Sequence, residues 1–200
     1  PGPCGTAIAI AAGGDHTVAL KSDGTVWTFG DNYYGQLGDN TTTERHTPVQ
    51  VHGEGDIGFL TDIIAISAGY EHTVALKSDG TVWAWGSNDY GRLGDNTTTS
   101  RNTPVQVHGM DDIGFLTDII AIAAGGYHTV ALKSDGTVWA WGWNYWGQLG
   151  DGTTTWRTTP VQVHGEGDIG FLTDIIAISA GDRHTVALKS DGTVWAWGWN

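Results

Sequence analysis

Residues 16–27 read HTVALKSDGTVW, and the same twelve letters return from positions 72, 128 and 184, always 56 residues apart. A fixed period of this length is the signature of a repeat architecture. The full units are residues 9–64, 65–120 and 121–176, preceded by a lead-in, 1–8, and followed by a partial unit, 177–200. Units one and two differ at 12 of 56 positions and units one and three at 8, which indicates recent duplication or deliberate construction.

Each unit predicts four short strands. HTVALK is followed by the tight Asp-Gly hairpin turn of SDG, and TVWAWG then places its two Trp residues on one face. A small apolar strand such as IIAISAG comes before this hairpin, and TPVQV follows a long polar Gly/Asn/Thr segment. No apolar stripe with a 3.6-residue period runs for more than a turn or two, so helix is not expected. Four-stranded units repeated radially predict an all-β fold, a β-propeller of four-stranded antiparallel blades.

The pattern AAGxxHTVALKSDGTVWAWGxNxxGQLG resembles the repeat of the regulator of chromosome condensation family, and it runs through essentially the whole chain. That resemblance implies a seven-bladed propeller, and it implies that the recurring His hydrogen-bonds within its own blade. This chain encodes four first strands and stops after the third strand of its last unit. We therefore expect self-association or a longer parent chain, because an open array exposes strand edges and Trp-bearing faces.

Fourteen columns of the repeat vary, and nine of them fall in the loops that join strands one to two and three to four. Antiparallel geometry sends those two loops out of the same end of a blade. The residues there are rigid aromatic side chains mixed with adaptable polar ones, a composition that binding surfaces favour. We predict a ligand-binding face made of Asp15, Asp31, Tyr33, Tyr34, Glu44, His46, Tyr70, Glu71, Asp89, Tyr90, Arg92, Ser100, Tyr127, Trp143, Tyr145, Trp146, Trp156, Arg183 and Trp199.

The predicted function is a non-catalytic binding scaffold for a protein or other macromolecular ligand. Two alternatives stay open: a structural protein that assembles with itself into a ring or polymer, and an engineered or amplified repeat protein without an evolved ligand. Loop drift alone also produces variable columns. It predicts change at both ends of a blade, however, and the opposite end varies only at Glu54/Met110 and Gly55/Asp111.

Enzymatic and cofactor chemistry find no support in the motifs. The His of HTVAL recurs once per blade without a ligand cluster, so we interpret it as structural and expect no metal. No Ser/His/Asp set, Cys/His pair or phosphate-binding Gly loop is present, so we expect no catalysis and no cofactor. Light-sensing members of the resembled family carry Trp-Arg before His-Thr. Here those positions hold other pairs, such as Gly14-Asp15 and Asp182-Arg183.

Composition narrows the partners further. The formal net charge is −13, and no Lys/Arg cluster offsets it, so nucleic acid is not an expected partner. No apolar run is long enough to predict a membrane-spanning helix. The lone Cys4 cannot form an internal disulfide, and it is a spectator thiol or one used for lipid or intermolecular attachment. We expect an extracellular or cell-surface location rather than a cytoplasmic one.

Overall fold

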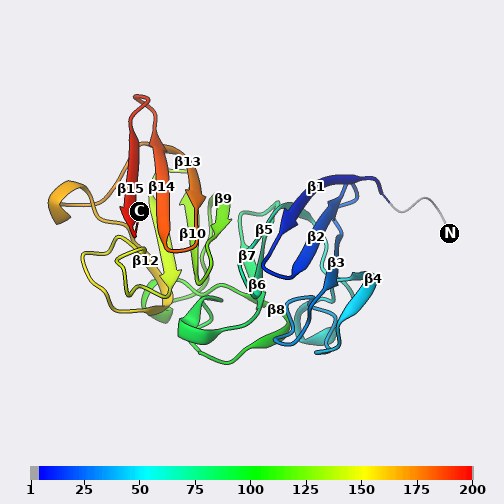
Figure 1. The fold of residues 1–200 in the computed structure, drawn as a ribbon. Helices are drawn as coiled ribbons and strands as arrows, with labels where there is room; N and C mark the ends of the chain where they lie inside the picture. Colours follow the sequence, from blue (N-terminus) through cyan, green and yellow to red (C-terminus); the bar gives the residue numbers. More distant parts are fainter. Residues whose placement is uncertain (1–4, 200) are drawn as a thin grey trace.

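The computed structural model describes residues 5–199, so Cys4 lies outside the described residues. The chain folds into four antiparallel sheets whose strands follow sequence order, and their first strands β1, β5, β9 and β13 lie next to one another in turn (Figure 1). Three sheets have four strands, and the last has three. This confirms the predicted all-β array of propeller blades.

The blades have nearly identical boundaries. Blade 1 contains β1 (Ala7–Ala12), β2 (His16–Lys21), β3 (Val26–Gly30) and β4 (Arg45–Gln50). Blade 2 contains β5 (Ile63–Ala68), β6 (His72–Lys77), β7 (Val82–Gly86) and β8 (Arg101–Gln106). Blade 3 contains β9 (Ile119–Ala124), β10 (His128–Lys133), β11 (Val138–Gly142) and β12 (Arg157–Gln162). Blade 4 contains β13 (Ile175–Ala180), β14 (His184–Lys189) and β15 (Val194–Gly198).

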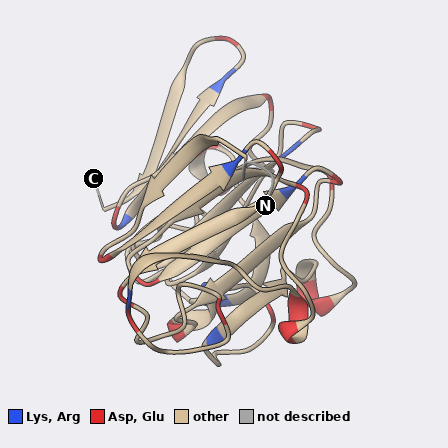
Figure 2. Cartoon of the chain, turned by 90° about the vertical axis from the view of Figure 1, so that its right-hand side faces the viewer, with Lys and Arg blue, Asp and Glu red and all other residues tan. Residues whose placement is uncertain are grey.

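Helical structure among the described residues is limited to single 3-10 turns. Three of them, η1 (Glu54–Asp56), η3 (Met110–Asp112) and η4 (Glu166–Asp168), lie in the connections between blades, and η2 (Asp89–Gly91) follows β7. Asp and Glu gather in these turns and in the loops around the sheets (Figure 2). In the described part of the chain, no helix has the length and apolar character needed to cross a membrane.

The Ser-Asp-Gly-Thr turn also connects neighbouring blades. Asp79 Oδ1 accepts hydrogen bonds from the backbone N–H of Thr81 at 3.0 Å and from its hydroxyl at 2.6 Å. Gly80 has a φ of +80°, which suits a residue without Cβ, and its carbonyl accepts a bond from the N–H of Ile119 in blade 3. A side chain at position 80 would therefore disturb the contact with the next blade.

The core lies between blades rather than within one. Val18, Leu20 and Val26 of blade 1 pack against Ala75 and Trp85 of blade 2, and all five side chains are buried. The indole N–H of Trp85 donates to the backbone carbonyl of Gln36 at 2.9 Å. Equivalent clusters join blades 2 and 3 and blades 3 and 4. The second Trp of the third strand, Trp85 in blade 2 and Trp141 in blade 3, therefore packs fully buried between blades.

The recurring His is structural, but the expectation that it bonds within its own blade is wrong. His16 Nε2 lies 2.9 Å from Thr73 Oγ1 in blade 2, and His72 and His128 contact Thr129 and Thr185 in the same way. Each Thr hydroxyl also donates to a backbone carbonyl, which for Thr73 is that of Gln36. The His–Thr pair thus bridges consecutive blades.

Candidate functional site

The variable loops bring aromatic side chains from three blades into one series. Tyr70 and Tyr127 have ring centroids 5.2 Å apart, Tyr127 and Trp143 5.4 Å, and Trp143 and Tyr145 6.2 Å. The series continues through Trp146 to Trp199, and Tyr90 joins it 6.0 Å from Trp143. We call these residues the aromatic cluster: Tyr70, Tyr90, Tyr127, Trp143, Tyr145, Trp146 and Trp199.

Much of the aromatic cluster faces solvent. Tyr145 is 63% exposed, Trp199 53% and Trp146 40%. The loops between β5 and β6 and between β9 and β10 supply Tyr70 and Tyr127, while the loops after β11 and β15 supply the Trp residues. Contiguous exposed apolar surface of this kind marks interaction sites in soluble proteins. The cluster therefore forms the core of the candidate site.

Arg183 lies inside the aromatic cluster. Its guanidinium carbon is 4.8 Å from the ring centroid of Trp199 and 5.9 Å from that of Trp143, and its Nε is 3.1 Å from Asp182 Oδ2. Arg183, Tyr90, Tyr127 and Trp143 line a cavity of about 220 Å³, which we call the rim pocket. A pocket with three aromatic walls and one cation suits a single side chain of a partner.

Arg92 is buried beneath this surface, with 1% of its side chain exposed. It occupies the position of Gln36 and Gln148, and its guanidinium lies 4.9 Å from the ring centroid of Tyr127. The carboxylates of Glu71 and Asp89 are 3.7 and 3.9 Å away. Burial lowers the pKa of Arg92, while these two carboxylates act to raise it. Arg92 therefore supports the aromatic cluster from below and is not itself a contact residue.

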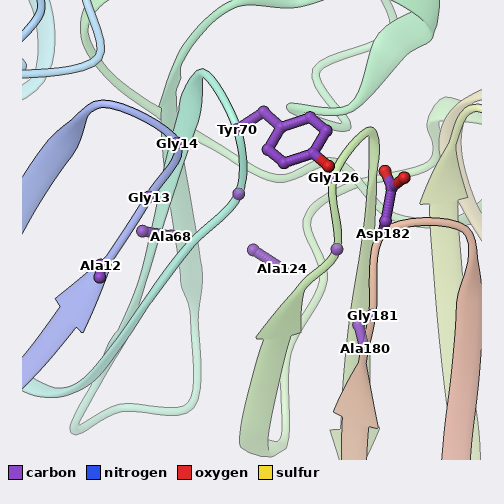
Figure 3. A pocket seen from close by; sticks show the side chains of 12 residues that line it. Ala12, Gly13, Gly14, Ala68, Tyr70, Ala124, Gly126, Ala180, Gly181 and Asp182 are labelled. Carbon is purple, nitrogen blue, oxygen red and sulfur yellow. The ribbon is translucent and has the colours of Figure 1, made fainter.

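Tyr70 reaches across blade 3 toward blade 4. Its hydroxyl points at the Asp182 carboxylate, with Gly126 between the two (Figure 3). The negative charge of Asp182 raises the pKa of the Tyr70 phenol. A Cβ at position 126 would clash with Asp182 Oδ1, so only glycine leaves room for this approach. The same residues border a cavity of about 280 Å³ at the ends of β1, β5, β9 and β13.

The predicted residues of blade 1 lie beside the aromatic cluster and not within it. Tyr33 and Tyr34 contact each other at 4.8 Å, and Tyr33 is 73% exposed. The charge of Glu71 in blade 2 raises the pKa of Tyr34. Asp31 accepts a hydrogen bond from Gln36 Nε2 at 2.7 Å, and Asp15 is exposed.

The predicted residues in the last part of the long loop lie apart from the aromatic cluster. Glu44 and His46 are exposed and lie 3.6 Å apart, and the Ser100 hydroxyl accepts a bond from the N–H of Asn88. Trp156 is 46% exposed and makes no aromatic contact with the cluster. The Asn40 column lies along the side of the blade. Its backbone N–H donates to the carbonyl of Asn102 near the start of β8, while its side-chain amide donates to Asp56 in η1. The expectation that all nine loop columns project from one end is therefore wrong for this column.

The histidines that follow the fourth strands lie next to carboxylates. His52, His108 and His164 each pair with an Asp in the adjacent 3-10 turn, namely Asp56, Asp112 and Asp168. Within residues 5–199, no three His, Cys, Asp or Glu side chains are grouped so as to hold a metal ion.

Known proteins share both the sequence pattern and the fold. The chain is 32% identical to the ultraviolet-B receptor UVR8 of Arabidopsis thaliana over 94% of its own length and 40% of that protein. It is also 32% identical to human E3 ubiquitin-protein ligase HERC2 over 96% of its length, which is 4% of that protein. The chain thus spans less than half of these relatives.

Solved structures share the fold of this chain. Prp20p from Saccharomyces cerevisiae superposes with a TM-score of 0.77 at 27% identity, covering 97% of this chain and 44% of that one. Human WBSCR16, at 22% identity, shares the fold with a TM-score of 0.79, over 96% of this chain and 47% of that one. The family model described as regulator of chromosome condensation (RCC1) repeat matches residues 23–76, 79–132 and 135–188. The chain therefore belongs to the family of regulator of chromosome condensation repeat proteins.

Proposed function

We propose that this chain is a binding scaffold whose partner is a protein held on the aromatic cluster. The observation that carries the proposal is the contact series from Tyr70 to Trp199, which keeps large aromatic surfaces exposed across three blades. Tyr and Trp residues provide most of the binding energy in many protein interfaces. A related protein also has a protein partner: one solved structure is described as Kap60 bound to yeast RCC1 (Prp20), 26% identical to this chain with a TM-score of 0.75.

Variability alone does not support this proposal, because the constant end of each blade has a packing reason to stay constant. The carbonyls of Gly24, Gly80 and Gly136 each accept a bond from the next blade. What supports binding is that aromatic side chains supplied by different columns meet one another and stay exposed. Drift in independent loops gives no reason for that meeting.

Repeats of the chain itself supply the test variants. Trp143→Ser and Trp199→Ser each introduce the residue that blade 2 carries at the same column, Ser87, so we expect the fold to tolerate them. A library of random 12-residue peptides displayed on phage is selected on the wild-type chain and then tested on the double variant. We expect enriched peptides to bind the wild type at least tenfold better than the variant.

The control is Phe115→Ala, which removes a side chain that is 53% exposed outside the aromatic cluster. Binding should survive this change. Peptides that bind wild type and the Trp143→Ser/Trp199→Ser variant equally would refute the proposal, provided that both proteins show the same circular dichroism spectrum.

A second function, self-association, is favoured by the last blade. Val194 is 67% exposed, whereas its counterparts Val26, Val82 and Val138 are fully buried under the following blade. Either a further blade of a longer chain or a second copy would cover this face. The solution mass of the 200-residue polypeptide tests the second of these.

A further inference from the structure

The charge on the variable loops is distributed unevenly along the arc. The loops of blades 1 and 2 carry Asp15, Asp31, Glu71 and Asp89, and the corresponding positions of blades 3 and 4 carry mainly Tyr and Trp. The side chain of Asp89 is 61% exposed and that of Glu71 35%. Asp15 is exposed too. Carboxylates therefore face solvent at one end of the candidate site.

The single cation of these acidic loops does not cancel their charge at the surface. Arg92 is 1% exposed and its guanidinium lies 3.7 Å from Glu71 and 3.9 Å from Asp89, so it offsets one of the four negative charges while the carboxylates of Glu71 and Asp89 stay partly accessible to solvent. In blades 3 and 4, by contrast, Arg183 is matched by Asp182 at 3.1 Å. The surface thus runs from an acidic part on blades 1 and 2 to a neutral aromatic part on blades 3 and 4.

The lining of the rim pocket indicates which type of partner side chain it can hold. Its walls are the rings of Tyr90, Tyr127 and Trp143, and Arg183 forms the remaining wall. The described residues place no carboxylate in the lining of the pocket to match an incoming Lys or Arg, and Arg183 already occupies the cation position over the Trp143 and Trp199 rings, so the pocket favours an apolar or aromatic side chain. Basic side chains would find their match outside the pocket, near Asp15, Glu71 and Asp89.

We infer that the partner segment is a polarised polypeptide, with an apolar or aromatic anchor in the rim pocket and Lys or Arg residues over blades 1 and 2. This inference rests on the proposed function, because it specifies the chemistry of the same site. Phosphate backbones are unsuited to the acidic part, and acidic peptides would be repelled there.

The composition of the selected peptides tests the inference. Peptides that lose binding on Trp143→Ser/Trp199→Ser should contain an excess of Lys and Arg over Asp and Glu, beside one or two aromatic or large aliphatic residues. An excess of Asp and Glu among them, or no charge bias, overturns the inference and leaves the proposed function standing. A selection that yields no peptide dependent on the two Trp residues defeats both.

Charge removal provides a second test on a synthetic copy of the most enriched peptide. Asp15→Asn/Asp89→Asn should weaken binding about tenfold in 50 mM NaCl and much less in 500 mM NaCl, since salt screens such interactions. Glu71 stays in place because of its contact with buried Arg92. The control Glu54→Gln/Asp111→Asn removes two exposed carboxylates from the connections between blades and should leave the affinity unchanged. Equal affinities for all three proteins in 50 mM NaCl would contradict the inference.

Discussion

At the residue scale, the recurring His of blades 1 to 3 is fixed in one protonation state by its neighbours. Thr129 Oγ1 donates to the carbonyl of Arg92 at 2.9 Å, so it accepts from His72 Nε2, 3.1 Å away. The other ring nitrogen, Nδ1, is buried without a hydrogen-bond partner. Protonation would place a charge on that nitrogen in an apolar site. Burial accordingly lowers the pKa of His16 to about 4 and that of His128 to about 3.

This state makes the fold sensitive to acid. Unfolded histidines take up protons below about pH 6.5, whereas the folded ones resist until about pH 4 or lower. The free energy of unfolding therefore keeps its full value above pH 6.5 and decreases as pH falls toward 4. The decrease due to His16 alone is about 3 kcal/mol. Urea unfolding at pH 7, 6, 5 and 4 should show this loss. His46→Ala, at an exposed His, should keep the same profile. A free energy of unfolding that stays flat across this range would contradict the account.

The structural role of this His could be predicted from the sequence, but its partner could not. HTVAL recurs without ligands nearby, which excluded a metal site. The partner lies 57 residues away, at the Thr that follows the next repeat's His. Repeat spacing does not show which blades touch, so the bond was expected within one blade.

At the element scale, one buried Asn organises the long loop that presents Tyr90, Trp146 and their neighbours. The side-chain amide of Asn88 donates to Asp95 Oδ1 at 2.9 Å and to the carbonyls of Thr97 and Thr99, while its Oδ1 accepts from the N–H of Leu93. Asn32 and Asn144 do the same in blades 1 and 3. These bonds hold the shape of a loop whose one element of regular structure in blade 2 is the short 3-10 turn η2.

We expect Asn88→Ala to lower the free energy of unfolding by about 2 to 4 kcal/mol, because several buried groups lose their partner at once. The matched control is Asn96→Gly, which copies Gly152 of blade 3 and should cost far less. Urea unfolding of both variants gives the comparison, and amide exchange should show faster opening of residues 88–100 in Asn88→Ala only. Equal stabilities would mean that the Asn network is not what holds the loop.

The strands and turns could be predicted from the alternation of apolar and polar residues, the Asp-Gly pairs and the Trp spacing. The path of the long loop could not. Nothing in the letters GDNTTT shows that Asn40 turns back toward Asp56 or that position 92 becomes buried. Tertiary contacts between blades decide both. The sequence therefore predicted the candidate site only as a set of variable repeat positions. The structure shows which of these positions form the aromatic cluster and which, such as Arg92, are buried beneath it.

At the scale of the whole molecule, two blade faces lack the cover that the other blades provide. Blade 1 leaves Ala19 and Phe29 half-buried, while Ala75 and Trp85 at the equivalent positions of blade 2 are fully buried. Blade 4 leaves Val194 exposed on the opposite face. The same two kinds of face meet at every junction inside the chain, so the free faces complement each other.

Two copies of the 200-residue polypeptide should therefore join head to tail. Burying about 500 Å² of apolar surface contributes about 12 kcal/mol at about 25 cal/mol per Å². Association itself costs at least about 4 kcal/mol, which leaves about 8 kcal/mol and a micromolar affinity when the shapes already match. Sedimentation equilibrium should give a mass above the 21.2 kDa of one chain. Val194→Asp should lower the measured mass to that of one chain, because it places a charge where a neighbouring blade would pack. The control Ile57→Asp, at a loop residue 82% exposed, should leave the higher mass of the wild type unchanged. A wild-type chain that stays at 21.2 kDa up to 100 μM, a concentration about tenfold above this range, would show that the free faces do not pair between copies.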